Sequence, residues 1–277
     1  MIDSFENKLT ELYGDGVTYD VKDAQGDMST LNSIASELKT ADYDLVVPIV
    51  TPATQAVVNA GVTAPVVFIS VTDPVAAGIM GDMAKPDKNA TGTSNIVPVD
   101  EIFTLAGKLT PDVKNIGILY CSGEKNAALT AEKAKAYLDT TDYTYEEVTV
   151  ASSNEVQQAA QSLAGKVDAI YIPIDSTVQS AMAQVVEAAN AAGIPVYGSE
   201  IEQVKNGCLA SVSIDYVALG KVTGEMAIRA LEGEALAEMP VQTISDATPV
   251  VNTEVMASFG FEMPEGYENA ETVVTNK

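Results

Sequence analysis

The stretch DLVVPIVTPATQAVVNAGVTAPVVFIS at residues 44–70 is echoed by DAIYIPIDSTVQSAMAQVVEAANAAGIPVYGSE at residues 168–200. Each copy opens with Asp and an apolar run, turns through a polar tip, continues into a helix and ends in a second strand led by Pro. Short continuous apolar runs are typical of parallel strands that are covered on both faces. The chain therefore contains one α/β unit twice, and two such lobes that face each other enclose a cleft.

The repeat divides the chain into two lobes. We expect the first lobe to comprise residues 1–97 and 215–248, and the second to comprise residues 98–214 and 249–277, with a ligand cleft between the lobes. With 277 residues, each lobe is long enough to bury its own core. The predicted fold class is α/β, with two doubly wound parallel sheets joined by a three-strand hinge.

Apolar periodicity places the individual elements. In the first lobe it predicts strands at residues 17–22, 45–50, 66–69 and 91–96, and helices at residues 28–38 and 54–60. In the second lobe a helix opening at residue 100 is followed by strands at residues 115–120, 143–150, 168–174 and 195–197 and by helices at residues 125–138, 154–163 and 177–192. A strand at 208–214, a helix at 216–231, a strand at 249–251 and a helix at 253–259 complete the pattern, and the tail after residue 264 has weak periodicity.

The two halves differ at their beginnings. The second lobe starts with NIGILYCSGEKNA at residues 115–127, whereas nothing comparable precedes Val17. In a doubly wound lobe the first strand lies inside the sheet, so its loss leaves unpaired backbone groups. We therefore expect the first strand of lobe 1 to be missing from this chain. The alternatives are that another segment fills its place or that self-association with a second copy complements the gap.

Composition excludes several classes of partner. The net charge of −24 would repel phosphate backbones, so no nucleic acid is expected to bind. No apolar run is long enough to span a membrane, and the start of the chain lacks an export signal. The two cysteines, Cys121 and Cys208, match neither a disulfide framework nor a metal-ligand spacing. We expect no metal site and no cofactor.

Four runs carry a resemblance to a known family: TPATQAVVNAGVTAPVVFISVTDPVAAGI, NATGTSNIVPV, EVQQAAQSLAGKVDAIYIPIDSTVQSAM and CLASVSIDYVALGKVTGEMA. They resemble ABC-transporter substrate-binding proteins of the group that includes tryptophan- and tyrosine-binding members. The similarity extends from Asp23 to Phe259.

The resemblance implies a type I periplasmic-binding-protein fold that holds a small ligand and delivers it to an ABC permease. The implied ligand is an amino acid, hydrophobic or aromatic. Members of the group are extracytoplasmic, in the periplasm or as cell-surface lipoproteins, although neither the export signal nor the lipobox Cys is present in this chain.

Ligands of open α/β sheets bind beyond the carboxyl ends of the strands. At these positions the first lobe presents small polar side chains and an accessible helix start, whose N–H groups suit a carboxylate. By resemblance to amino-acid-binding members, this group is assigned to the ligand carboxylate and to part of its amino group. Helix capping is the alternative role for Thr and Ser. The candidate residues of the first lobe are Thr51, Ala53, Thr54, Ser70, Thr72 and Asp73.

The second lobe contributes more acidic candidates. Asp175 takes the place that Thr51 holds in the first copy, so one half offers a hydroxyl and the other a carboxylate, which fits the two ends of a zwitterion. The alternative is that Asp175 only caps the helix that follows. Asp215, just past a hinge strand, either contacts the ligand or holds the hinge. The candidates of the second lobe and hinge are Ser122, Glu124, Asn126, Asp175, Thr177, Glu200 and Asp215.

Catalysis is not expected. Without His there is no Ser-His or Cys-His pair, and no Gly-rich nucleotide signature follows a strand. A cofactor-independent racemase would need two opposed thiols, but Cys121 follows one predicted strand while Cys208 lies inside another. A ligand-sensing domain that passes its signal to a partner protein is the other alternative.

Overall fold

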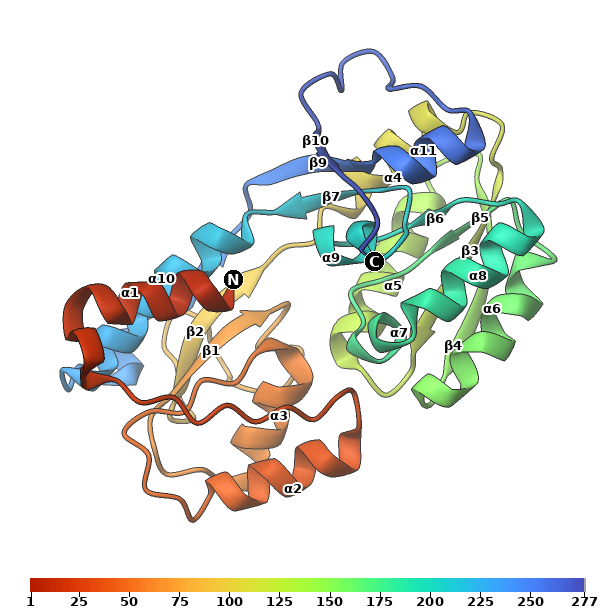
Figure 1. The fold of residues 1–277 in the computed structure, drawn as a ribbon. Coiled ribbons are helices and arrows are strands. Elements are labelled where there is room, and N and C mark those ends of the chain that lie inside the picture. Colours follow the sequence, from red (N-terminus) through yellow and green to blue (C-terminus); the bar gives the residue numbers. More distant parts are fainter. Residues whose placement is uncertain (277) are drawn as a thin grey trace. The chain divides into compact units, whose positions relative to one another are not determined.

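A computed structural model describes residues 1–276. The chain forms two compact units, which we call unit 1 (Met1–Ile96 and Asp215–Asp246) and unit 2 (Val97–Ile214 and the residues from Ala247 onward). The chain passes from one unit to the other three times, after Ile96, Ile214 and Asp246. Each unit is built from a sheet and covering helices (Figure 1).

Unit 1 contains a parallel sheet of three strands in the order β1-β2-β8. Residues 46–49 extend this sheet, because Val46 and Ile49 form isolated bridges to β1. Within residues 1–276, no strand pairs with the edge of residues 46–49 that faces away from β1. The interior first strand that the duplicated pattern calls for is thus absent from the described sheet. The strands are β1 (Val66–Val71), β2 (Ala90–Asn95) and β8 (Gln242–Ile244).

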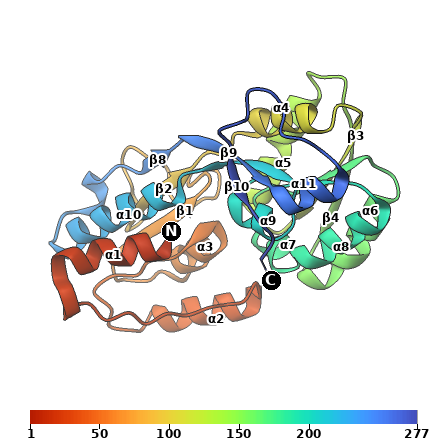
Figure 2. The same ribbon diagram turned by 45° about the horizontal axis from the view of Figure 1, so that its top comes forward.

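Four helices form two layers on each face of this sheet. In Figure 1 the order is α1, α10, sheet, α3 and α2, and contacts join each successive pair; Figure 2 shows the same elements turned by 45°. Asp27 caps α2 by accepting from the backbone N of Thr30 at 2.7 Å, as the sequence predicts. The helices are α1 (Ile2–Tyr13), α2 (Met28–Leu38), α3 (Val50–Ala60) and α10 (Tyr216–Leu231), with short 3-10 turns η1 (Gly14–Gly16) and η3 (Leu236–Glu238).

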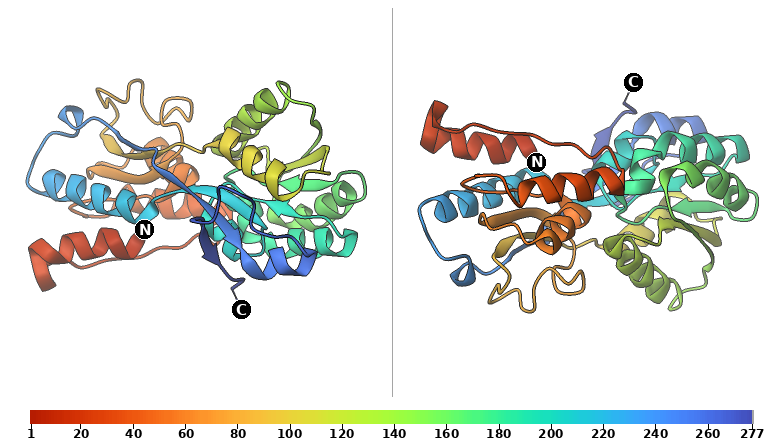
Figure 3. Two further views of the ribbon diagram at one scale, coloured as in Figure 1. Left: turned by 90° about the horizontal axis from the view of Figure 1, so that it is seen from above. Right: turned by 90° about the horizontal axis from the view of Figure 1, so that it is seen from below.

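Helices α1 and α10 pack closely because α10 carries glycine at the contact. A Cβ atom on Gly220 would lie 2.2 Å from Ser4 Oγ, and one on Gly224 would lie 2.7 Å from Lys8 Cβ. Phe5 and Leu9 of α1 are buried as a result. The two helices run side by side in all views of unit 1, including both views of Figure 3.

Gly92 holds β1 and β2 together at another close approach. Its φ is +154°, and a Cβ atom there would lie only 2.0 Å from the carbonyl oxygen of Phe68. Both the backbone conformation and the space therefore require glycine.

We expect Gly92→Ala to lower the free energy of unfolding by more than about 3 kcal/mol, because the new methyl group must push β1 and β2 apart. Chemical denaturation followed by circular dichroism measures this change. Gly16→Ala is the control, since its Cβ would meet only Tyr13 Cβ at 3.9 Å. Equal stability of the two variants would contradict the close approach.

Unit 2 contains seven strands in the order β10-β9-β7-β6-β5-β3-β4. All neighbours are parallel except β7 and β9. The chain starts this sheet at β3, adds β4 on one side, and then returns to add β5, β6 and β7 on the other. The strands are β3 (Asn115–Cys121), β4 (Thr144–Val150), β5 (Ala169–Tyr171), β6 (Val196–Tyr197), β7 (Ala210–Ile214), β9 (Ala247–Asn252) and β10 (Glu271–Val273).

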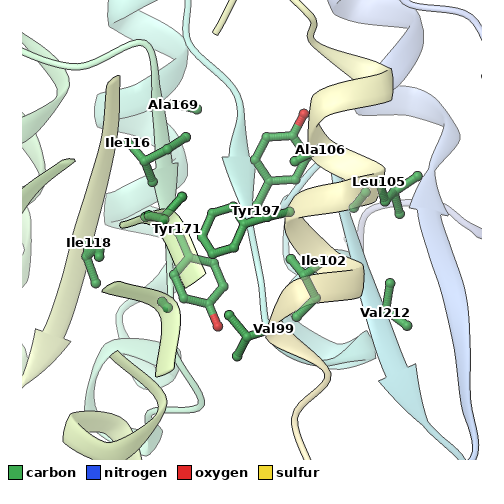
Figure 4. Packing of buried hydrophobic residues seen from close by; sticks show 14 of the residues in the cluster. Val99, Ile102, Leu105, Ala106, Ile116, Ile118, Ala169, Tyr171, Tyr197 and Val212 are labelled. Carbon is green, nitrogen blue, oxygen red and sulfur yellow. The ribbon is translucent and has the colours of Figure 1, made fainter. Parts of the chain in front are cut away.

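Helices cover both faces of this sheet, so its central strands are apolar throughout. Ile116 and Ile118 of β3 pack on the face of α4 and α5, whereas Leu119 belongs to the cluster on the face of α6 and α8. Tyr171 and Tyr197 lie between the strands and α4 (Figure 4). The helices are α4 (Val99–Leu109), α5 (Lys125–Leu138), α6 (Val156–Ala164), α7 (Ser176–Ser180), α8 (Met182–Ala192), α9 (Ile201–Lys205) and α11 (Thr253–Phe259), with the 3-10 turn η2 (Ser153–Glu155).

The predicted α/β class with doubly wound parallel sheets is confirmed, but several elements differ. The strand predicted at residues 17–22 is wrong: this segment pairs with no strand in the described chain, and Val21 is 79% exposed. The strand at residues 45–50 is reduced to two bridges. The helix at residues 177–192 is divided into α7 and α8 at Ala181. The sequence also missed α9, β8 and β10, which are short.

Within residues 1–276, no helix combines the length and the apolar character that crossing a membrane requires.

Candidate functional site

In unit 1, the predicted site residues lie where residues 46–49 and β1 end. Helix α3 begins directly after Ile49, so Thr51, Ala53 and Thr54 lie in its first turns. Ser70 is near the end of β1, and Thr72 and Asp73 follow it. Because parallel strands end at the same edge of a sheet, these polar groups share one edge of unit 1.

Two residues at this edge have left-handed backbone conformations that glycine would normally occupy. Val50 has a φ of +65° and Ser70 a φ of +62°. They follow Ile49 and Ile69, which are paired with each other, so the two conformations occur at matching positions of adjacent strands. A left-handed conformation is costly for a β-branched side chain, and such strain is concentrated at functional sites.

Hydrogen bonds tie these strand ends together. Thr51 Oγ1 accepts from the backbone N of Thr72 at 3.4 Å, and Ser94 Oγ donates to the carbonyl oxygen of Thr72 at 3.3 Å. The backbone N of Ser70 donates to Thr93 Oγ1, also at 3.4 Å. Thr54 Oγ1 donates to the carbonyl oxygen of Val50. The hydroxyls of Thr51 and Thr54 therefore have structural partners within unit 1.

Two buried polar atoms in this region have no partner in the described chain. Ser70 is 3% exposed and Asn95 is 1% exposed, yet neither Ser70 Oγ nor Asn95 Oδ1 forms a hydrogen bond. Burying such atoms unpaired is unfavourable, so each is available to accept or donate a further hydrogen bond. Sequence reasoning missed Asn95. Its position, a polar residue ending a buried strand just before the chain leaves unit 1, was the available indication.

We expect Ser70→Gly to be more stable than Ser70→Ala by about 1 kcal/mol, because both remove the hydroxyl but only glycine relieves the left-handed conformation. Urea denaturation of the two variants measures the difference. An alanine variant as stable as the glycine variant would show that Ser70 is unstrained.

In unit 2, the candidates gather where the strand order reverses. From β3 the chain adds β4 on one side and β5 on the other, so the ends of β3 and β5 flank the switch point of the sheet. Ligands of doubly wound sheets bind at this point. Ser122, Glu124 and Asn126 follow β3, and Asp175 and Thr177 follow β5.

Asp175 links the two strand ends. One carboxyl oxygen accepts from the backbone N of Val178 at 2.7 Å and caps α7, and the other accepts a short bond from the backbone N of Cys121 at the end of β3. Asp175 is only 2% exposed. The capping role considered from the sequence is therefore present, and each oxygen retains a lone pair for another donor.

Glu124 is buried beside Asp175 and receives four donors. Its Oε1 accepts from the backbone N and from Oγ1 of Thr177, both at 2.7 Å, and its Oε2 accepts from the backbone N of Ser176 and from Asn126 Nδ2. These bonds hold the loop after β3 against the first turn of α7. Glu124, Asn126, Asp175 and Thr177 thus form one connected group, whereas Ser122 is exposed to solvent.

Asn126 has an unused acceptor within this group. Its Nδ2 donates to Glu124 Oε2 at 3.2 Å and to the carbonyl oxygen of Ile174 at 2.8 Å, which fixes the orientation of the amide. The Oδ1 atom is buried and forms no hydrogen bond in the described chain.

Burial shifts the titration of Asp175. Desolvation raises the pKa of Asp175 to about 7, and the charge of Glu124 adds to this rise, against the opposing effect of the two backbone hydrogen bonds. The unfolded chain releases this proton near the usual pKa of 3.8, so between about pH 4 and pH 7 the folded state binds a proton that the unfolded state lacks. This contribution to the free energy of unfolding is lost as the pH rises through that window.

We therefore expect the stability of Asp175→Asn, relative to the unsubstituted protein, to increase between about pH 5 and about pH 8. Denaturation at both pH values measures the difference. Asp27→Asn removes an exposed capping carboxylate whose pKa is lowered by its bond from Thr30, so its effect should be constant over the same range. A constant effect of Asp175→Asn would instead mean that Asp175 ionises normally.

The three remaining candidates accept from backbone N–H groups of residues that follow them. Glu200 caps α9 by accepting from the backbone N of Glu202 and Gln203, and burial raises its pKa to about 7. Asp215 is exposed and caps α10 through Val217 and Ala218. Asp73 accepts from the backbone N of Ala76. No hydrogen bond of the described chain joins these three to the groups above.

Residues 6–273 match the family model described as ABC transporter substrate binding protein. A curated relative, a tyrosine-binding protein from Clostridioides difficile, is 36% identical over 249 residues, which are 90% of this chain and 72% of the relative. Both findings confirm the resemblance that the sequence shows.

Solved structures agree. A domain from Streptococcus pneumonia in complex with L-Trp has a TM-score of 0.93 and 35% identity, covering 98% of this chain and 94% of that chain. A conserved domain protein from Vibrio cholerae has a TM-score of 0.90 and 33% identity, covering 98% of this chain and 95% of that chain.

Proposed function

Because the chain belongs to the family of ABC transporter substrate-binding proteins, we propose that it binds a hydrophobic or aromatic amino acid outside the cytoplasm and delivers it to an ABC permease. The observation that carries the amino-acid assignment is the L-Trp complex, whose fold matches this chain along nearly its whole length at 35% identity. The tyrosine-binding relative supports the same class of ligand.

The proposed binding place is the cleft predicted between the two lobes. In it, the ligand carboxylate accepts from Ser70 Oγ and from free N–H groups at the start of α3. Ser70 suits this role because its buried hydroxyl has no other partner. The strained conformations of Val50 and Ser70 also support a functional role of this edge.

The ammonium group, in this proposal, binds to unit 2 through Asp175. The carboxyl oxygens of Asp175 each hold one backbone donor and can accept another, and Asn126 Oδ1 adds a neutral acceptor. Charge-assisted bonds to a buried carboxylate are stronger than neutral ones. Contact with both lobes would draw them together by bending the hinge strands, and the permease would recognise this closed form.

Binding is proposed to occur without chemical change. Both thiols are buried, and desolvation raises the pKa of Cys121 and of Cys208, which disfavours the thiolates that a racemase would need. The family to which the chain belongs consists of binding proteins.

A thermal-shift screen of the L-amino acids, followed by nucleosides and sugars, tests the assignment. We expect L-tryptophan or L-tyrosine to give a rise in melting temperature that grows with ligand concentration, because a ligand that binds only the folded state stabilises it. Stabilisation by a sugar or nucleoside alone would contradict the amino-acid assignment.

Replacing Asp175 by Ala should weaken binding of the identified amino acid by roughly 1.5 to 3 kcal/mol, because the ammonium group loses a charged acceptor. Isothermal titration calorimetry measures the affinity, and Asp27→Ala is the matched control at an exposed cap. If Asp175→Ala binds as tightly as the control, Asp175 does not contact the ligand.

A further inference from the structure

Two carboxyl groups are buried next to each other in unit 2. Glu124 is 4% exposed and Asp175 is 2% exposed, and both bind backbone N–H groups of the same turn, Glu124 those of Ser176 and Thr177 and Asp175 that of Val178. Two like charges that share a desolvated site repel each other, so a proton on one of the two carboxyl groups is favoured. The pair therefore carries one proton and a net charge of −1 when no ligand is bound.

The surrounding elements of unit 2 provide no positive charge that would replace this proton. Cys121, at the end of β3, is a buried thiol. Glu155 in η2 is exposed, and its carboxylate accepts from the backbone N of Ala151. Lys125, the first residue of α5, is exposed, and no salt bridge of the described chain joins it to either carboxyl group.

The hydrogen bonds indicate which group holds the proton. Glu124 accepts from four donors, whereas Asp175 accepts from two backbone N–H groups. Donors stabilise the ionised form of a carboxyl group, so Asp175, which has fewer donors, is the better place for the proton. The proton accordingly resides on Asp175, in agreement with the upward shift of its pKa.

Asn126 provides a second and independent observation. Its Nδ2 contacts Glu124 Oε2, so its amide group lies at the carboxyl pair, and its buried Oδ1 has no donor. Asn126 Oδ1 can accept a hydrogen bond, and Asp175 becomes negatively charged when it loses its proton. Together they can bind a group that has several N–H donors and a positive charge. A primary ammonium group has these properties.

We propose that the ammonium group of the ligand replaces the proton of the Glu124–Asp175 pair, with Asp175 and Asn126 Oδ1 as its acceptors. The charge of the site is conserved: the protonated pair carries −1, and two carboxylates with one bound ammonium group also carry −1. One proton is released to solvent for each ligand bound. This inference rests on the proposed function and adds to it a dependence of capture on pH.

The affinity should therefore fall by about tenfold for each unit of pH below about pH 6, because ligand and proton compete for the same site. Above about pH 8 the pair has already lost its proton, and the affinity should no longer depend on it.

Calorimetric titration of the full chain with L-tryptophan and with L-tyrosine, in buffers that differ in ionisation enthalpy, counts the protons directly. We expect close to one proton released per ligand at about pH 6 and close to none at about pH 8.5. Asp27→Asn, a cap outside the proposed site, should release the same number as the unsubstituted protein.

Two variants locate the proton. Glu124→Gln removes the neighbouring charge but leaves the desolvation of Asp175, so the release at about pH 6 should fall without vanishing. Asp175→Asn has no proton to give at this position and should release none. Proton release that is unchanged in both variants would place the proton elsewhere and overturn the assignment.

The outcomes separate this inference from the proposed function. If neither amino acid produces a binding signal, the amino-acid assignment itself fails. If binding occurs but the unsubstituted protein releases no proton at about pH 6, the proton exchange is wrong while the binding function stands.

Discussion

Parallel strand pairing is the constraint on which each unit depends. Because β3 to β7 run in one direction, all of their carboxyl ends lie at one edge of the sheet, and the polar residues that follow different strands are brought together there. Asp175, which follows β5, therefore accepts a hydrogen bond from the backbone N of Cys121 at the end of β3. The same pairing in unit 1 brings the left-handed Val50 and Ser70 to matching positions.

The fold could be predicted from the sequence where packing and local pattern agree. The apolar runs that become β1 and β3 are buried on both faces, as a short continuous apolar run between turn residues predicts. Residues 17–22 alternate as a strand should, but a strand exists only with a neighbour, and the described chain provides none there. The short strands β8 and β10 form only because they pair with strands distant in the sequence. Their residues therefore show no local pattern from which a strand could be predicted.

Only part of the candidate site could be predicted from the sequence. The side chains that follow the strands could be named from the sequence, since strand ends and helix starts can be recognised. The partners of those side chains could not, because Asp175 bonds to Cys121 and Glu124 bonds to Thr177, each more than fifty positions away. Nor could the sequence show that Ser70 and Asn95 are buried without partners, since an unpaired atom is a property of three-dimensional packing.

The glycine contact between α1 and α10 has a consequence for how the protein is made. Helix α1 is synthesised before β1 to β7, whereas Gly220 and Gly224 are synthesised after all of these strands. The apolar face of α1, with Phe5 and Leu9, must therefore wait in an incomplete chain until most of unit 2 has been translated. Such delayed closure between distant segments is slow and leaves apolar surface open to aggregation, so α1 depends on protection by chaperones until α10 has been made.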